Sequence, residues 1–578
     1  MVSARLALFA ILLAVPLIWG SFTAYQLGLF LLYGIVAQGI ALCWGRAGFL
    51  PLGQALFFGI GAYLGGGAMK FAGESWLVLS PLLVGACLVP ALLAWAIGIL
   101  VFNRQVGNGP YFALITLALS MLGLQLANSL EWLTGGFNGM TGIPGLPGID
   151  SYGGLYYVIV PVLALTTLAL AHLLRSPFGQ LLSAIAQNEE RLQFLGFRTS
   201  GFKALAFAIS AGLAGIAGVL FAAHDGIVTP QSVGYLLSAE LVIWTAVGGR
   251  SSLLGPVIGA VLIGYLTAEL RDTFPYWEIV VASVFIVVVL RFPNGIAGLG
   301  ERLSWLSRRS LPRQANPERD IAIAPLEREE GTTLSFQDVH VRMNGVRILN
   351  GLDLSIRARG IQCIIGPNGA GKTSAFNVLT GRLPATSGEI VWRGRPIAGR
   401  KPFRVARLGI ARKFQVPSVF PDLTVGQNID IALWANRLSF VQLFSLGAYR
   451  WRTAVLASLE RLFPELADPS VLARELSLGQ RQMLEFAMTN LVEPQLMLLD
   501  EPCAGLSTEE TSRMIEAISA LATEYGWAVL IIEHDMRVVE RLSDHVYVLH
   551  LGARLAEGSM EAIKADEAVR AIYSGGSK

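Results

Sequence analysis

Residues 366–373 read GPNGAGKT, which matches the pattern G-x-x-x-x-G-K-[ST] of a phosphate-binding loop. The loop directly follows an apolar run, residues 361–365 (IQCII), which predicts a buried strand. Its glycines let the backbone curl so that successive amide groups point inward, and the helix expected next adds its positive end. The sequence therefore predicts the strand, loop and helix of an α/β P-loop fold in this half of the chain.

Two residues of this loop have specific expected roles in holding ATP. Lys372 is expected to reach the β- and γ-phosphates, and Thr373 to offer its hydroxyl to Mg²⁺. The loop residues predicted to bind nucleotide are Gly366, Pro367, Asn368, Gly369, Ala370, Gly371, Lys372, Thr373 and Ser374.

Two further apolar strands are expected to end in acidic and imidazole side chains. Residues 496–501 (LMLLDE) place Asp500 where a carboxylate would hold Mg²⁺, and Glu501 where a general base would polarise the attacking water. Residues 531–535 (IIEHD) place His534 where it can contact the γ-phosphate. Positioning and charge stabilisation carry the rate of phosphoryl transfer. These strands therefore predict an ATP hydrolysis site.

The composition divides the chain into two parts. Of the 578 residues, 53% are apolar and only 15% are charged, which exceeds the apolar share of a soluble protein. Residues 1–291 hold just eleven lysines and arginines, whereas the remainder has the charge density of a soluble domain. A net charge of +3 is too small for a chain of this size to suggest nucleic-acid binding. We expect a membrane domain at 1–300, a linker at 301–331 and a nucleotide-binding domain at 332–578.

Apolar segments of the first part have lengths suited to a bilayer, whose ~30 Å core needs roughly 20 helical residues. We expect an α-helical polytopic domain of about ten spans, at residues 6–20, 28–43, 48–69, 77–102, 111–130, 155–174, 204–223, 238–249, 253–270 and 276–290. Glycine and proline interrupt the eighth and ninth. For the first span, a cleaved signal peptide is the alternative. Gln38, Gln54 and Asn128 are candidate cavity-lining groups.

The distribution of basic residues predicts the orientation of these spans. With the N-terminus inside, nine basic residues fall on the cytoplasmic side and two fall outside, which satisfies the positive-inside rule. The inside set is Arg5, Arg46, Arg104, Arg175, Arg191, Arg198, Lys203, Arg250 and Arg291, and the outside set is Lys70 and Arg271. The phosphate-binding loop would then lie in the cytoplasm.

Residues 175–203 form the longest polar interruption on the predicted cytoplasmic side. Their apolar and polar positions alternate in a way that favours short amphipathic helices along the membrane. An ordinary solvated loop is the alternative. We expect a docking element for the nucleotide-binding domain, because a nucleotide-driven machine must pass force to its membrane part.

Residues 476–480 (LSLGQ) resemble the signature of ABC transporter nucleotide-binding domains, with Leu478 where glycine is most common. The resemblance implies that Ser477, Gly479 and Gln480 face ATP held by a partner domain. It also implies that Gln415, within RKFQ, links metal and water to the membrane part. The family pattern continues at residues 504–507 (AGLS). Met343 departs from it, standing where an aromatic residue usually stacks on adenine.

The membrane half resembles the inner-membrane permeases of bacterial branched-chain amino acid importers. The matching stretches, in family order, are residues 135–143 (GGFNGMTGI), 176–179 (SPFG), 188–189 (NE), 195–197 (LGF) and 253–256 (LLGP). Residues 412–420 (RKFQVPSVF) and 500–511 (DEPCAGLSTEET) also resemble the ATPases of related urea and short-chain amide importers.

These resemblances imply an ATP-driven importer of branched-chain amino acids in the bacterial inner membrane, with permease and ATPase in one polypeptide. They imply pairing with itself or with a second permease and a second ATPase, and delivery of solute by an extracytoplasmic binding protein. Import of urea or short-chain amides is the alternative within the family. Two competing hypotheses are an exporter half-molecule, which has about six long spans, and a nucleotide-gated membrane receptor that transports nothing.

Overall fold

The computed structural model describes residues 2–72, 75–103, 110–292, 294–298, 319–320, 332–446, 451–452 and 454–574. The chain separates into two units. Unit 1 comprises Met1–Ala186 and Ser200–Arg313, and unit 2 comprises Gln187–Thr199 and Gln314–Lys578. The expected linker at 301–331 lies outside the described residues except at β1 (Arg319–Asp320), which pairs with β8 (Trp451–Arg452).

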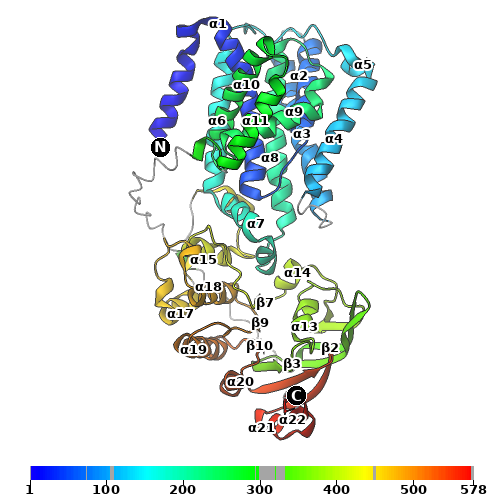
Figure 1. Cartoon of the computed structure of the whole chain (residues 1–578), viewed down its shortest axis with the longest axis vertical. Helices are drawn as coiled ribbons and strands as arrows, with labels where there is room; N and C mark the ends of the chain where they lie inside the picture. The colour runs from blue at the N-terminus through cyan, green and yellow to red at the C-terminus, as the bar shows by residue number, and fades with distance from the viewer. Residues whose placement is uncertain are drawn as a thin grey trace. The chain divides into compact units, whose positions relative to one another are not determined.

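Unit 1 is built from helices (Figure 1). Helix α1 packs against α10, α6 and α9, and α2 packs against α3. Small residues allow close approach: a Cβ at Gly259 of α10 would lie 2.1 Å from the Trp244 carbonyl oxygen of α9. The helices are α1 (Val2–Ala41), η1 (Leu42–Arg46), α2 (Gln54–Ala72), α3 (Trp76–Phe102), α4 (Tyr111–Ser129), α5 (Glu131–Thr134), η2 (Gly136–Asn138), α6 (Tyr156–Arg175), α7 (Pro177–Phe194), α8 (Thr199–Asp225), η3 (Pro230–Val233), α9 (Tyr235–Gly248), α10 (Gly255–Thr273) and α11 (Trp277–Arg291).

The expected ten spans are not confirmed. Within the described part of the chain, six helices are long and apolar enough to cross a membrane: Phe9–Arg46, Gln54–Ala72, Trp76–Phe102, Tyr111–Ser129, Tyr156–Arg175 and Thr199–Asp225. The first two expected segments fall in one helical run, which breaks at Gly20 with φ 83° and ψ 175°. The last three expected segments are helical, as α9, α10 and α11, but none is among the six.

Unit 2 contains two sheets. The larger has the strand order β12-β11-β4-β10-β9-β7, in which all pairs are parallel except β11 with β12. The smaller has the order β3-β2-β5-β6 and is antiparallel. The strands are β2 (Thr332–Met343), β3 (Val346–Arg357), β4 (Gly360–Ile365), β5 (Ser387–Trp392), β6 (Arg395–Pro396), β7 (Ile410–Lys413), β9 (Leu496–Asp500), β10 (Ala528–Ile532), β11 (His545–His550) and β12 (Ala553–Gly558).

The helices of unit 2 lie between its strands or after the last one. They are α13 (Lys372–Leu379), α14 (Pro402–Ala406), α15 (Val425–Trp434), α16 (Phe440–Phe444), α17 (Ala454–Leu462), η5 (Pro464–Leu466), η6 (Ala473–Glu475), α18 (Leu478–Leu491), α19 (Thr508–Tyr525), α20 (Met536–Leu542), α21 (Met560–Ala565) and α22 (Glu567–Ser574). Strands β4, β9 and β10 are largely apolar and buried, and they neighbour one another in parallel. Their carboxyl ends therefore meet at one sheet edge, where ligands bind in open α/β sheets.

Helix α7 covers most of the expected amphipathic segment. Its helical geometry breaks at Asn188, with φ −155° and ψ 84°, close to the residue where the chain passes from unit 1 to unit 2. The apolar positions on both sides of the break are buried: Leu181, Leu182, Ile185, Leu192, Leu195 and Phe197. Residues 187–199 thus fold as part of unit 2, although the sequence places them between two long apolar helices.

Candidate nucleotide and hydrolysis site

The predicted phosphate-binding loop joins β4 to α13, as its sequence indicates. The loop requires glycine at its start, since a Cβ at Gly366 would lie 2.2 Å from the Leu549 carbonyl oxygen. Gly371, with φ 98°, precedes the first residue of α13. The Lys372 ammonium donates hydrogen bonds to the carbonyl oxygens of Gly366 at 2.7 Å and Pro367 at 3.1 Å. Burial lowers the pKa of Lys372, and the charges of Glu501 and Asp500 oppose that shift.

The remaining loop residues are arranged around this lysine. Asn368, Gly369 and Thr373 are exposed, whereas Ala370 is buried and Ser374 is half-buried. Thr373 and Ser374 lie in the first turn of α13. Their amide groups are therefore at the positive end of a helix, which favours anionic ligands.

Asp500 ends strand β9 and is buried against a cation. Its Oδ2 accepts a hydrogen bond from a terminal nitrogen of Arg412 at 3.1 Å, and both side chains are almost fully enclosed. Arg412 also donates to Asn377 Oδ1 at 2.8 Å and Thr380 Oγ1 at 3.2 Å. Burial raises the pKa of Asp500, and the Arg412 guanidinium opposes the shift. Oδ1 of Asp500 has no hydrogen-bond partner among the residues described.

The structure brings together three residues expected at the hydrolysis site: Glu501, Gln415 and His534. The side-chain nitrogen of Gln415 donates to Glu501 Oε2 at 2.7 Å, and His534 Nδ1 lies 3.7 Å from Glu501 Oε1. Glu501 has φ 46°, a left-handed backbone conformation unusual for glutamate. Its amide donates to the Ile532 carbonyl at 2.9 Å, which fixes this turn against the end of β10. Strain of this kind at a carboxylate is common at functional sites.

The predicted signature residues begin helix α18. Ser477 is its N-cap, and it forms a capping box with Gln480 in which each side chain accepts a hydrogen bond from the other residue's amide. Gly479 is buried, and a Cβ there would lie 2.1 Å from Glu510 Oε1. The hydrogen bonds of this turn are thus made within its own helix start, and Leu478 is exposed.

Met343 ends strand β2 at the hairpin turn that leads to β3. It pairs with Val346 across a two-residue turn, Asn344 and Gly345, both with positive φ. Met343 is 44% exposed and Val346 is 65% exposed. The pair presents an apolar surface of the kind that could pack on a base, and its thioether is polarizable.

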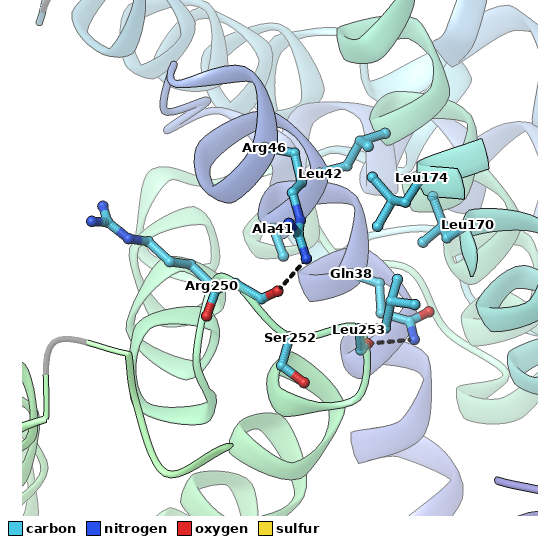
Figure 2. A pocket seen from close by; sticks show the side chains of 10 residues that line it. Gln38, Ala41, Leu42, Arg46, Leu170, Leu174, Arg250, Ser252 and Leu253 are labelled. Atoms are coloured by element: carbon cyan, nitrogen blue, oxygen red, sulfur yellow. Dashed lines mark hydrogen bonds between the residues drawn. The ribbon is translucent and has the colours of Figure 1, made fainter. Parts of the chain in front are cut away.

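Unit 1 holds a pocket with both polar and apolar lining residues, one of which is Gln38 (Figure 2). The Gln38 amide donates to Thr167 Oγ1 at 2.8 Å and to the Leu253 carbonyl at 3.0 Å. A terminal nitrogen of Arg46 donates to the Ser251 carbonyl at 2.8 Å. The lining residues are Gln38, Ala41, Leu42, Arg46, Leu170, Leu174, Arg250, Ser251, Ser252 and Leu253.

The remaining two candidate cavity residues of unit 1 lie elsewhere than this pocket. Gln54 is buried and its amide donates to Ser210 Oγ at 2.8 Å. Asn128 is half-buried in α4, and in the described structure its Oδ1 has no hydrogen-bond partner.

Comparison with known proteins places both halves of the chain. A family model described as branched-chain amino acid transport system / permease component matches residues 22–290, and one described as ABC transporter matches residues 349–504. The branched-chain amino acid transport ATP-binding protein LivG of Salmonella typhimurium is 35% identical over 250 residues, which are 42% of this chain and 97% of LivG. The chain belongs to the ABC transporter family.

A second relative of this ABC transporter agrees with that assignment. BraF of Pseudomonas aeruginosa, a branched-chain amino acid transport ATP-binding protein, is 36% identical over 250 residues, 42% of this chain and 97% of BraF. A crystal structure of a nucleotide-free ATP-binding cassette from an ABC transporter is 27% identical, with 42% of this chain and 99% of that chain covered and a TM-score of 0.36. The predicted family is confirmed, and unit 2 carries an ABC ATPase that binds and hydrolyses ATP.

The residues of this ATPase fit a bound Mg²⁺. Mg²⁺ prefers oxygen ligands and keeps contact with substrate phosphates. The Thr373 residue is exposed, the Gln415 side chain is bonded to Glu501 at the same sheet edge, and Asp500 Oδ1 is a buried carboxylate oxygen without a partner in the described residues. Among the described residues, no group of three or more His, Cys, Asp or Glu side chains is placed to hold a metal ion by itself.

The sequence pattern does not single out two residues of the ATPase site. In the sequence, Arg412 is noticed only as part of the RKFQ stretch, although its guanidinium forms an ion pair with Asp500. Glu533 is buried at the end of β10, where its carboxylate accepts from the amides of Cys503 at 3.4 Å and His534 at 3.2 Å. The Glu533 carboxylate therefore links the turn that follows Glu501 to the His534 backbone. Its position one residue before His534 is the available signal, because an acid that ends a buried strand needs partners.

Proposed function

We propose that this ABC transporter imports branched-chain amino acids, or similar small solutes, across the bacterial inner membrane with energy from ATP hydrolysis. Residues 1–300 would be the permease domain, 301–331 the linker and 332–578 the ATPase domain. The permease family model and the LivG and BraF relatives support this proposal, because all are described by branched-chain amino acid transport.

One observation supports the proposed coupling of solute transport to ATP hydrolysis. Residues 187–199 lie in sequence between α6 and α8, both long and apolar, yet they pack inside the ATPase unit. The Gln187 side chain accepts from the Asp422 amide at 2.7 Å, and the Asn188 side chain donates to Ser418 Oγ at 2.9 Å. A rearrangement of the ATPase would move these residues and, through the continuous chain, the two helices.

The hydrolysis site would work through positioned charge. Lys372 and the amides at the start of α13 bind the phosphates. Glu501 accepts a proton from the attacking water, and Gln415 and His534 orient that water and the γ-phosphate. Thr373, Asp500 and Gln415 would hold Mg²⁺, which would supply positive charge to the phosphate oxygens when bound. Such positioning and charge stabilisation are the main sources of rate in phosphoryl transfer.

The signature turn at Ser477–Gln480 would serve a second nucleotide. The N-terminus of α18 suits a γ-phosphate. Ser477 and Gln480 hydrogen-bond to each other, and Leu478 is exposed. Two ATP would be enclosed between two such domains. The chain would pair with itself, or with a second permease and a second ATPase, and would receive solute from an extracytoplasmic binding protein.

The basic residues, sorted over the ten expected spans, support the proposed orientation of a multi-pass protein with the ATPase domain in the cytoplasm. In accord with this, Arg191 and Arg198, both expected inside, belong to the segment that packs in the ATPase unit.

Uptake by reconstituted vesicles tests this proposal. Purified chain with its companion subunits and binding protein would be placed in proteoliposomes loaded with ATP in the compartment that holds the ATPase. ATP-dependent accumulation of labelled leucine, competed by isoleucine and valine, is expected. Accumulation of urea or acetamide instead would support the alternative substrate class. Outward movement would support an exporter, and nucleotide binding without any solute movement would support a receptor.

A further inference from the structure

Arg191 is a buried cation in unit 2, although it belongs to the segment between two apolar helices. Its side chain is 1% exposed. One terminal nitrogen donates to the Arg412 carbonyl at 2.9 Å and lies 3.5 Å from Glu485 Oε1. The second terminal nitrogen donates to the Glu485 carbonyl at 3.2 Å and to Thr489 Oγ1 at 3.1 Å. The guanidinium thus joins strand β7 to helix α18.

Glu485 connects this guanidinium to the residues that lead to the hydrolysis site. Its Oε1 also accepts from the Phe414 amide at 3.1 Å, and its Oε2 lies 3.9 Å from the Lys413 ammonium. Lys413 donates to the Gln482 side-chain oxygen, and the side-chain nitrogen of Gln482 donates to the Gln415 carbonyl at 3.3 Å. Three successive residues, 413 to 415, are therefore held by one face of α18.

The same short stretch holds both acids of the hydrolysis site. Arg412 presents its carbonyl to Arg191 and its guanidinium to Asp500. Gln415, three residues on, donates to Glu501. Arg412 therefore lies between Arg191 and the Asp500 carboxylate, and the 412–415 stretch lies between Arg191 and Glu501.

We propose that Arg191 is a positioning residue for ATP hydrolysis, which fixes the 412–415 stretch and thereby the Asp500 and Glu501 carboxylates. The proposal rests on the proposed function, in which residues 187–199 move with the helices that flank them. Displacing Arg191 would release the Arg412 carbonyl and the Glu485 carboxylate together, so that movement of this segment would change the geometry of the acids.

A Mg²⁺ titration of ATPase activity tests this role in the full-length protein with its companion subunits. Arg191→Met is expected to lower kcat and to raise the Mg²⁺ concentration for half-maximal activity about tenfold, as changes behind metal-binding groups commonly do. The KM for ATP at saturating Mg²⁺ should change little, because Lys372 and the loop are untouched. Arg191→Lys should recover part of the loss, since lysine can pair with Glu485 but cannot reach both carbonyls.

The matched control is Glu190→Gln, in the same segment. Glu190 pairs with Arg382 at 2.7 Å, and both side chains are largely exposed. This variant should keep both kcat and Mg²⁺ dependence. If Arg191→Met fails to fold, Thr489→Val removes one acceptor of the guanidinium and should give a smaller change of the same kind.

A purely structural role for Arg191 predicts a different result, namely loss of thermal stability with an unchanged Mg²⁺ dependence in every variant that folds. That result would overturn the proposal. The assay measures hydrolysis alone, so wild-type protein that hydrolyses ATP but accumulates no amino acid would contradict the proposed function and leave the role of Arg191 to be decided by the titration.

Discussion

Replacement of Arg412 by methionine should destabilise the ATPase unit strongly. The Arg412 guanidinium and the Asp500 carboxylate are 3.1 Å apart and almost fully enclosed. Methionine has similar length and no donors, so Asp500 would keep a buried charge without a counter-charge, and Asn377 and Thr380 would lose a donor. Breaking a buried pair in this way costs about 3–5 kcal/mol. For a unit of this size, that loss lowers Tm by roughly 10 °C.

The pH dependence of this loss has a definite sign. Burial raises the pKa of Asp500, and Arg412 opposes that rise, so Arg412→Met should raise the pKa further. A protonated Asp500 needs no counter-charge. The stability gap between the variant and the wild type should therefore shrink as the pH falls through the raised pKa of Asp500, and should be largest where the carboxylate is ionised.

Thermal unfolding of purified protein, followed by tryptophan fluorescence, measures these effects. The control is the double variant Arg412→Met with Asp500→Asn, which removes both charges. It should be more stable than the sum of the two single changes predicts, by about 2–3 kcal/mol, because the two groups are coupled. Additive single and double effects, or a Tm for Arg412→Met within a degree or so of the wild type, would refute the reasoning.

Two further changes test the nucleotide and hydrolysis residues. Because burial lowers the pKa of Lys372, its positive charge is lost at lower pH than for an ordinary lysine. ATP affinity measured by fluorescence titration should therefore fall as pH rises into the alkaline range, and Lys372→Ala should bind weakly at every pH; a pH-independent affinity would contradict this. Gln415→Ala removes the 2.7 Å hydrogen bond to Glu501 and should lower kcat about 10–100-fold, with little change in KM for ATP. An equal rise in KM would mean that Gln415 contributes to ATP binding instead.

The ATPase half could be predicted largely from local sequence. The loop, the acids at 500 and 501 and His534 each follow a continuous apolar strand, and parallel strands bring their ends to one edge. Arg412 and Glu533 could not be found in this way, because Arg412 pairs with Asp500, 88 residues away, and Glu533 accepts from Cys503, 30 residues away. A lone basic or acidic residue beside a strand carries no local sign of being buried.

The membrane half was harder to predict, because hydropathy gives the length of an apolar segment but not where one helix ends and the next begins. The first two expected segments lie in one helical run broken at Gly20, and α9 is shorter than a bilayer requires. The amphipathic pattern of residues 175–203 predicts helices and burial. It could not reveal that residues 187–199 belong to unit 2, because the contacts they make there, such as that of Arg191 with Glu485, join residues far apart in sequence.

The most direct test of coupling compares solute-stimulated hydrolysis in the wild type and in Glu501→Gln. Glutamine keeps the shape of Glu501 but cannot accept a proton, and loss of a general base costs about 10²–10⁴-fold in rate. In proteoliposomes with solute-loaded binding protein, the wild type should hydrolyse ATP faster than with unloaded binding protein and should accumulate leucine. The Glu501→Gln variant should lose both activities while still binding ATP. Hydrolysis that is indifferent to solute, or leucine accumulation by the variant near the wild-type rate, would contradict the account.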